Sequence, residues 1–214
     1  MWCTLGTSTP PSAYARDAIP GWQRSQASKS CRLTRSKSST ERDRSLYEAR
    51  LLVAEGQALR AASKYNEALA VNERALAIFT EVLGPASFEV GFVTNRMGVI
   101  YDIVGDDAKS EASARKALRI YESVLPADSL FLGDNLNNLG VIELNKGKFA
   151  EAESLLLRSM GVRERILGQE HRLYSQSLLN LGKLYRNRGD NDMAERAYEK
   201  ALGIRERVLG KDHA

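Results

Sequence analysis

The side chains that could carry out chemistry in this sequence are few, and the two histidines come first. His171 and His213 are the only histidines, and they stand 42 residues apart. A metal or catalytic site needs several convergent ligands, and no cysteine or carboxylate set accompanies this pair. We therefore interpret both histidines as turn residues. The sequence predicts no catalytic residues, no metal site and no cofactor.

Charged and amide side chains are the other polar groups that stand out. The stretches Arg163-Glu164-Arg165 and Arg205-Glu206-Arg207 alternate in charge at helical spacing, which is typical of solvated helix faces. Asparagines recur near the middle of the chain, and an amide offers both a donor and an acceptor to a peptide main chain. No glycine-rich phosphate loop follows a strand pattern. These residues favour binding over catalysis.

An ungapped internal repeat of 42 residues must position these side chains. Residues 173–214 align on 131–172, on 89–130 and, more weakly, on 47–88. One column of this alignment holds a glycine in every copy: Gly56, Gly98, Gly140 and Gly182. Such repetition is typical of a solenoid, in which each unit buries its apolar face against the next.

In each unit, two segments have apolar residues at the spacing of a helix, and a turn separates these segments. Gly105, Gly147 and Gly189 fit the left-handed position that ends a first helix, and Ser63 takes this column in the first unit. The sequence therefore predicts an all-α solenoid of about eight antiparallel helices, in repeats at approximately 45–88, 89–130, 131–172 and 173–214. We expect the first two repeats to be looser because Glu55 and Ala114 stand where later repeats have larger apolar residues, and Ser110 stands at a packing position that is alanine in the other repeats.

The repeat resembles a known family. Leu181-Gly182-x-x-Tyr185, followed by Ala194, Tyr198 and Ala201, is similar to the tetratricopeptide repeat (TPR), whose basic unit has 34 residues. The longer 42-residue unit resembles the repeats of kinesin light chains and nephrocystin-like proteins. The resemblance covers about residues 45–214. It implies a non-catalytic scaffold whose first helices line a concave groove for an extended peptide or a partner helix.

The resemblance also implies binding residues. In kinesin-light-chain-like grooves an asparagine just before the Leu-Gly pair contacts the ligand backbone, and this chain matches that position at Asn138 and Asn180. The predicted groove adds neighbouring polar residues of the same helices: Asn95, Arg96, Asn137, Lys183 and Arg186. The alternative is that all seven are solvated residues of amphipathic helices. The Lys-to-Arg pair that holds a carboxylate in chaperone-binding TPR domains is absent, which disfavours that function.

Residues 1–44 differ from the repeats. They are rich in Ser and Arg and lack a hydrophobic period, so we predict a disordered tail, with a transit peptide or a mis-assigned start as alternatives. Cys3 and Cys31, the only cysteines, both lie in this segment. Two cysteines outside the repeats suit a reducing compartment, so we predict a cytoplasmic protein, or an organellar one if the tail is a transit peptide.

Charge and hydropathy limit the partners. The tail carries eight basic and three acidic residues, and the rest carries 23 basic and 24 acidic ones. The repeats are thus nearly neutral, which disfavours nucleic acid, and an RNA-binding helical repeat ranks last because only Arg96, Lys183 and Arg186 are basic on the first helices. No apolar run is long enough for a membrane span.

Two further possibilities concern what lies around the repeats. The chain is a candidate adaptor fragment of a larger signalling or enzymatic protein whose effector domain lies beyond Ala214. The last helix pair is predicted to have one uncovered face, which a second copy could contact end to end.

Overall fold

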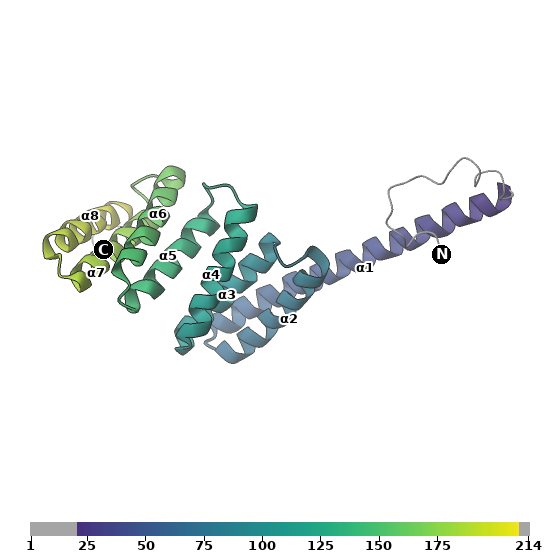
Figure 1. The fold of residues 1–214 in the computed structure, drawn as a ribbon, viewed down its shortest axis with the longest axis horizontal. Helices are drawn as coiled ribbons and strands as arrows, with labels where there is room; N and C mark the ends of the chain where they lie inside the picture. Colours follow the sequence, from purple (N-terminus) through teal and green to yellow (C-terminus); the bar gives the residue numbers. More distant parts are fainter. Residues whose placement is uncertain (1–20, 210–214) are drawn as a thin grey trace. The chain divides into compact units, whose positions relative to one another are not determined.

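The computed structural model describes the backbone of residues 21–209 and the side chains of residues 39–208. It divides into two compact units, residues 1–48 and residues 49–214, which are described separately. The described residues form eight helices: α1 (Gly21–Ala61), α2 (Tyr65–Leu83), α3 (Phe88–Val104), α4 (Asp107–Val124), α5 (Leu130–Asn145), α6 (Phe149–Leu167), α7 (Arg172–Arg188) and α8 (Asn191–Leu209). The predicted all-α solenoid is confirmed (Figure 1).

The N-terminal unit includes the first part of α1. The predicted tail, residues 1–44, overlaps this helix, because α1 begins at Gly21. Residues 1–20, with Cys3, lie outside the described part, and the side chain of Cys31 does too. The disorder of the tail, its end at residue 44 and the transit-peptide alternative therefore stay predictions. Among the described residues, no helix combines the length and apolarity needed to cross a bilayer.

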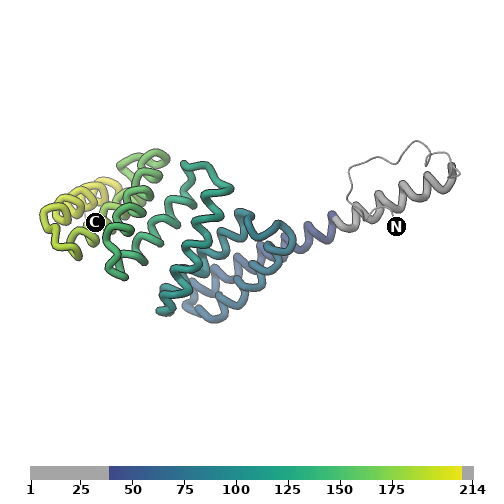
Figure 2. The backbone as a smooth tube through the Cα atoms, viewed as in Figure 1, coloured from purple at the N-terminus to yellow at the C-terminus, as the bar shows by residue number. Residues whose placement is uncertain are grey.

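The second unit is a row of helix pairs. The closest packing lies within the pairs α3/α4, α5/α6 and α7/α8, and each pair contacts the next through α2 with α3, α4 with α5, and α6 with α7. The tube in Figure 2 shows the chain reversing at each connection. Residues of the glycine column lie on the first helices α1, α3, α5 and α7, one per repeat. The predicted order of helix, turn, helix is thus observed.

The glycine column marks the closest approach within a pair. A Cβ atom added at Gly140 would lie 2.8 Å from Leu156 Cγ on α6, and one added at Gly182 would lie 2.6 Å from Tyr198 Cε1 on α8. Contacts under 3 Å are not tolerated by carbon atoms, so the Leu156 or Tyr198 side chain, or the helix that carries it, would have to shift. At Gly98 the nearest atom is Ser113 Cβ at 3.2 Å, which leaves the second repeat more open.

The turns between paired helices use the left-handed backbone, as predicted. Gly105, Gly147 and Gly189 have φ values of 81°, 74° and 94°. Ser63 takes the same conformation, with φ 58°, although it carries a side chain. Left-handed backbone costs an L-residue about 1–2 kcal/mol, so this turn stores strain that the other three avoid.

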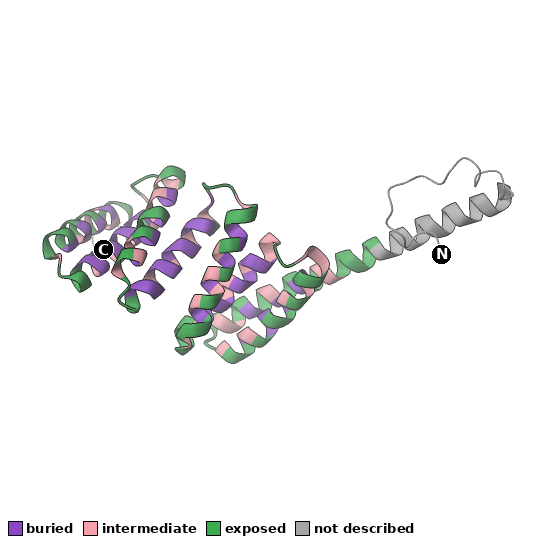
Figure 3. Ribbon diagram, in the orientation of Figure 1, coloured by how far each residue is buried: buried purple, intermediate pink, exposed green. Residues whose placement is uncertain are grey.

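The core lies between repeats as much as within them. One cluster joins Ala114 and Tyr121 of α4 to Leu136 of α5 and Leu155 of α6, and another joins Leu156 of α6 to α7 and α8. Figure 3 shows the buried residues on the faces that the stacked helices of the repeats turn toward one another. Each repeat therefore depends on its neighbours for burial.

First helices of adjacent repeats also touch. α3 contacts α5 and α5 contacts α7, whereas the second helices of neighbouring repeats make no comparable contacts among the described residues. The first helices are therefore closer together than the second ones, as expected on the inner side of a curved stack. We call the exposed side of α3, α5 and α7 the first-helix surface.

Candidate functional site

All seven residues of the predicted groove lie on the helices that form the first-helix surface. Asn95 and Arg96 belong to α3, Asn137 and Asn138 to α5, and the other three, Asn180, Lys183 and Arg186, to α7. The structure does not gather them into one cluster. It divides them among an amide chain, a hollow, an aromatic cluster, a contact from α7 to α5 and an open hollow on the last helix pair.

The amide chain links α5 to α7. Asn180 Nδ2 donates to Asn137 Oδ1 at 2.8 Å, and Gln176 Nε2 donates to Asn180 Oδ1 at 3.5 Å. Asn137 is only 8% exposed, so its amide is engaged between the helices. Asn180 remains partly exposed and keeps one amide hydrogen for a ligand. Neither residue is simply solvated, because their hydrogen bonds hold adjacent first helices in register.

The hollow lies between α3, α4 and α5 and has a volume of about 120 Å³. Asn95 and Asn138 stand at its rim, where both are partly exposed. Asn95 Oδ1 accepts a hydrogen bond from Asn135 Nδ2 at 2.9 Å, whereas Asn138 has no hydrogen-bond partner among the described residues. Asn138 is therefore the amide that is most available to a ligand.

Arg96 belongs to an aromatic cluster. Its guanidinium lies 5.4 Å from the centre of the Phe92 ring, and Phe92 packs edge-on against Phe131 at 5.8 Å. Burial lowers the pKa of Arg96, and the nearby charge of Arg60 lowers it further. The Phe92 ring covers part of the Arg96 side chain, so only the remaining exposed part can meet a ligand.

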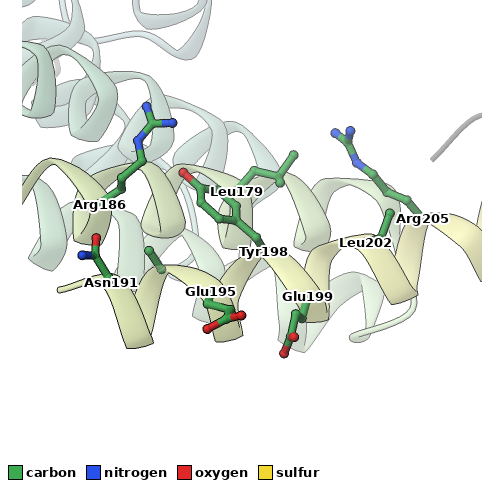
Figure 4. Close-up of a pocket in the computed structure, with 9 residues that line it drawn as sticks. Leu179, Arg186, Asn191, Glu195, Tyr198, Glu199, Leu202 and Arg205 are labelled. Carbon is green, nitrogen blue, oxygen red and sulfur yellow. The ribbon is translucent and has the colours of Figure 1, made fainter. Parts of the chain in front are cut away.

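Lys183 and Arg186 lie in the C-terminal half of α7. Lys183 Nζ donates to Asn145 Oδ1 at 3.4 Å, which links α7 to α5. Arg186 is exposed and borders an open hollow of about 690 Å³ beside Tyr198 and Leu202 (Figure 4). In this view Arg186 and Arg205 both point upward, on either side of the Tyr198 ring. We name this hollow the end face.

Arg163 corrects the prediction of a solvated charged face. It is 3% exposed, and its guanidinium donates to Asp134 Oδ1 at 2.8 Å, to Ser177 Oγ at 2.9 Å and to the Leu173 carbonyl at 3.1 Å. These partners lie on α5 and α7, so Arg163 joins the third repeat to the fourth. Helical spacing alone could not separate this buried arginine from its exposed neighbours, because the partners come from other helices.

A second charged group joins α4 to α5 and α6. Glu143 is fully buried and pairs with Arg115 at 2.6 Å and with Lys148 at 2.9 Å. Glu111 adds Lys146 and Arg115, whose hydrogen bonds lower the pKa of Glu111 to about 2. Each charged side chain of this group therefore has a partner of opposite charge on a neighbouring helix or turn.

The histidine at the start of α7 acts as a cap. His171 Nδ1 accepts a hydrogen bond from the Leu173 amide at 3.1 Å, which agrees with its interpretation as a turn residue. His213 lies outside the described residues. Within the part of the chain that is described, no three His, Cys, Asp or Glu side chains gather as metal ligands.

The repeat geometry and its glycine column define a TPR-type helical repeat, and comparison with known sequences gives the same family. The model of the tetratricopeptide repeat matches residues 47–123 and 132–213. The chain therefore belongs to the tetratricopeptide-repeat family, as its motifs predict. This family fold is in general a scaffold for protein interaction. No curated protein matches the chain.

Solved structures share the fold. BtubC (BKLC) from P. vanneervenii has a TM-score of 0.69 and 23% identity, over 76% of this chain and 65% of that protein. The chain thus matches only part of the length of BtubC. A putative kinesin light chain of Podosopora anserina with nearly identical TPR-like repeats has a TM-score of 0.58 and 18% identity, over 72% of this chain and 73% of that one. MamA has a TM-score of 0.55 and 14% identity, over 86% of this chain and 93% of its own. At these identities the likeness shows the fold alone.

Proposed function

We propose that this protein is a non-catalytic scaffold that holds an extended segment of another protein along the first-helix surface. The observation that carries the proposal is the hollow between α3 and α5, because two of the predicted groove residues, Asn95 and Asn138, lie at its rim. A hollow with largely apolar walls and an unengaged amide, that of Asn138, offers what an extended peptide needs. Side chains enter the hollow while main-chain groups meet the amides.

The polar groups of this surface suit a main chain more than a charged ligand. Asn138 has a free amide, and Asn180 has one amide hydrogen that is not used between the helices. These two residues stand 42 positions apart on adjacent first helices. A segment that crosses α5 and α7 could therefore bond to both through its backbone.

The test is selection of binding peptides from a random display library on the full chain, followed by affinity measurements. We expect Asn138→Ala to weaken a selected peptide by about 5- to 30-fold, since a buried hydrogen bond to a ligand is worth on the order of 1–2 kcal/mol. Asn66→Ala, at an exposed asparagine of α2, is the matched control and should leave affinity unchanged. Equal losses at Asn66 and Asn138, or no selected peptide at all, would overturn the proposal.

We also propose end-to-end association of two copies through the end face. Arg205 occupies the position of Arg163 one repeat later, and Leu202 occupies that of Met160, which packs against α7. The equivalent surface of the third repeat is therefore covered by a first helix, whereas Leu202 is 48% exposed. Light scattering should show a dimer that Leu202→Glu converts to a monomer. A monomeric wild-type protein at 100 μM would contradict this contact.

The proposed compartment is the cytoplasm, since both cysteines stand outside the repeats. Imaging of the tagged full chain tests this. An organelle pattern that is lost when residues 1–44 are deleted would favour the transit-peptide alternative instead.

A further inference from the structure

The hollow between α3 and α5 contains a polar group that the fold does not use. Ser110 of α4 is fully buried, and its hydroxyl has no hydrogen-bond partner. A buried hydroxyl without a partner costs free energy, so natural proteins seldom keep one unless a water or a ligand meets it. Ser110 lines both the 120 Å³ hollow and a smaller one of about 40 Å³ beside it.

The hollow exists because the second repeat has a small side chain, Ala114, where the later repeats have a large one. The repeat positions of Ala114 hold Leu156 in the third repeat and Tyr198 in the fourth, and both of these press against the glycine of the facing helix. At Gly98 that partner is reduced to Ala114, and Ser110 stands one turn before it. Space that a leucine or tyrosine fills elsewhere is therefore open here to a side chain from outside.

The two hollows together form a slot with one apolar stretch and one acidic end. Val99 of α3 and Val141 of α5 line the larger hollow, Asp102 borders both hollows, and the smaller hollow adds Asp107. Neither aspartate carboxylate has a hydrogen bond or ion pair among the described residues. From Asn95 to Asp102 the slot runs about 10 Å along α3, which is longer than an extended lysine side chain.

One cation stands at this end, and its charge is already compensated. Lys146 borders the smaller hollow, but its ammonium is bonded to Glu111. Glu111 also pairs with Arg115. The rim of the slot therefore keeps a net negative charge from Asp102 and Asp107, and it attracts a cation rather than an anion.

We propose that this slot, which we call the α3/α5 slot, binds a lysine side chain of the segment held on the first-helix surface. The methylene stem lies between Val99 and Val141, and the ammonium meets Asp102 and the Ser110 hydroxyl. The small end hollow suits a compact ammonium better than a planar guanidinium. This assignment rests on the proposed function, which it deepens by naming one residue type of the partner.

A small probe tests the slot without any peptide. The full chain is titrated with 1-pentylamine, a cation of lysine-like shape, while NMR follows the Val99 and Val141 methyls and the Ser110 amide. A ligand of about six non-hydrogen atoms binds in the millimolar range, so saturable shifts are expected at roughly 1–20 mM. Pentanoate and 1-pentanol have similar length without the positive charge, and each should bind at least about tenfold more weakly.

Two variants and one control sharpen this result. Ala114→Leu restores the residue type found at position 156, so it should fill the slot, abolish the shifts and keep the fold by circular dichroism. Asp102→Asn should weaken 1-pentylamine about tenfold and leave 1-pentanol unchanged. Asp192→Asn, at an exposed acid of α8, should change neither. Equal binding of amine, acid and alcohol would overturn the lysine assignment, and so would an absence of saturable shifts in the wild-type protein.

The peptide library separates this inference from the proposed function. If both hold, selected peptides carry a lysine at one fixed position, and the Ala114→Leu protein loses that preference alone. Peptides that bind without a lysine preference would overturn the slot and leave the scaffold standing. Binding of 1-pentylamine without any selected peptide would overturn the proposed scaffold function and leave the slot as a site for a cation.

Discussion

The glycine column offers the most quantitative prediction, because its members differ in the space around them. At Gly140 an added Cβ would meet Leu156 Cγ at 2.8 Å and Cδ2 at 2.9 Å, and Leu156 is fully buried. Overpacking a core costs about 1–3 kcal/mol, whereas alanine gains about 1 kcal/mol over glycine in a helix. We therefore expect Gly140→Ala to lower the free energy of unfolding by about 1 kcal/mol.

Gly98 should respond in the opposite direction. Its nearest neighbour, Ser113 Cβ, is 3.2 Å away, and the 120 Å³ hollow beside it lets α4 yield by a few tenths of an ångström. The gain in helix propensity then exceeds the packing cost, so Gly98→Ala should stabilise the protein by about 0.5–1 kcal/mol. The same substitution at two equivalent positions is thus expected to differ in sign.

Thermal unfolding followed by circular dichroism at 222 nm decides the matter. For a protein of this size each kcal/mol shifts Tm by about 2–4 °C, so the two variants should lie roughly 3–8 °C apart, with Gly98→Ala the more stable. Equal losses in both variants would refute the reasoning, because they would mean that the second repeat is packed as tightly as the third.

Three further predictions use the same measurement or a urea titration. Ser63→Gly should raise the free energy of unfolding by about 0.5–1 kcal/mol, because glycine removes the strain of a left-handed serine. The gain is smaller than the strain itself, since glycine also gives the unfolded chain more conformational entropy. A loss of stability would show that Ser63 is not strained. Arg163→Ala should cost about 2 kcal/mol and Arg205→Ala, its counterpart on the end face, under about 0.5 kcal/mol; similar costs would contradict the buried bridge. The pKa of Glu111 is lowered to about 2 in the folded chain, so its ion pairs stabilise fully above pH 4.5 and are lost as pH falls toward 2. Glu111→Gln should therefore be less stable than wild type at pH 7, and this difference should shrink below pH 4.5; a constant difference would contradict the assignment.

The sequence predicted the fold because its signals are local and repeated. The turn glycines and the glycine column are set by backbone conformation and close approach, and each appears at a fixed spacing that one chain reveals by itself. Ser63 shows the strength of the pattern, since it adopts the left-handed conformation that its column requires, with φ 58°. The helix order and the family followed directly from these positions.

The site was predicted less completely because it depends on contacts between repeats. Asn180 occupies the same repeat position as Asn138, yet Asn180 bonds to Asn137 while the Asn138 amide stays free. Arg163 and Arg205 are likewise equivalent in sequence, and only the presence of α7 makes one of them buried. A pattern along one helix cannot show which neighbour a side chain meets. The reduced side chain at Ala114 was visible in the sequence, but the hollow that it leaves could be seen only in the packed helices.

The most direct test of the scaffold is to map where a selected peptide binds. Methyl NMR of the full chain offers matched reporters: Val99 and Val141 line the hollow on the first helices, whereas Val124 and Leu157 are exposed on the second helices. The account predicts that a bound peptide shifts Val99 and Val141 and leaves Val124 and Leu157 unchanged. Shifts confined to Val124 and Leu157 would place the ligand on the opposite side and contradict the central claim.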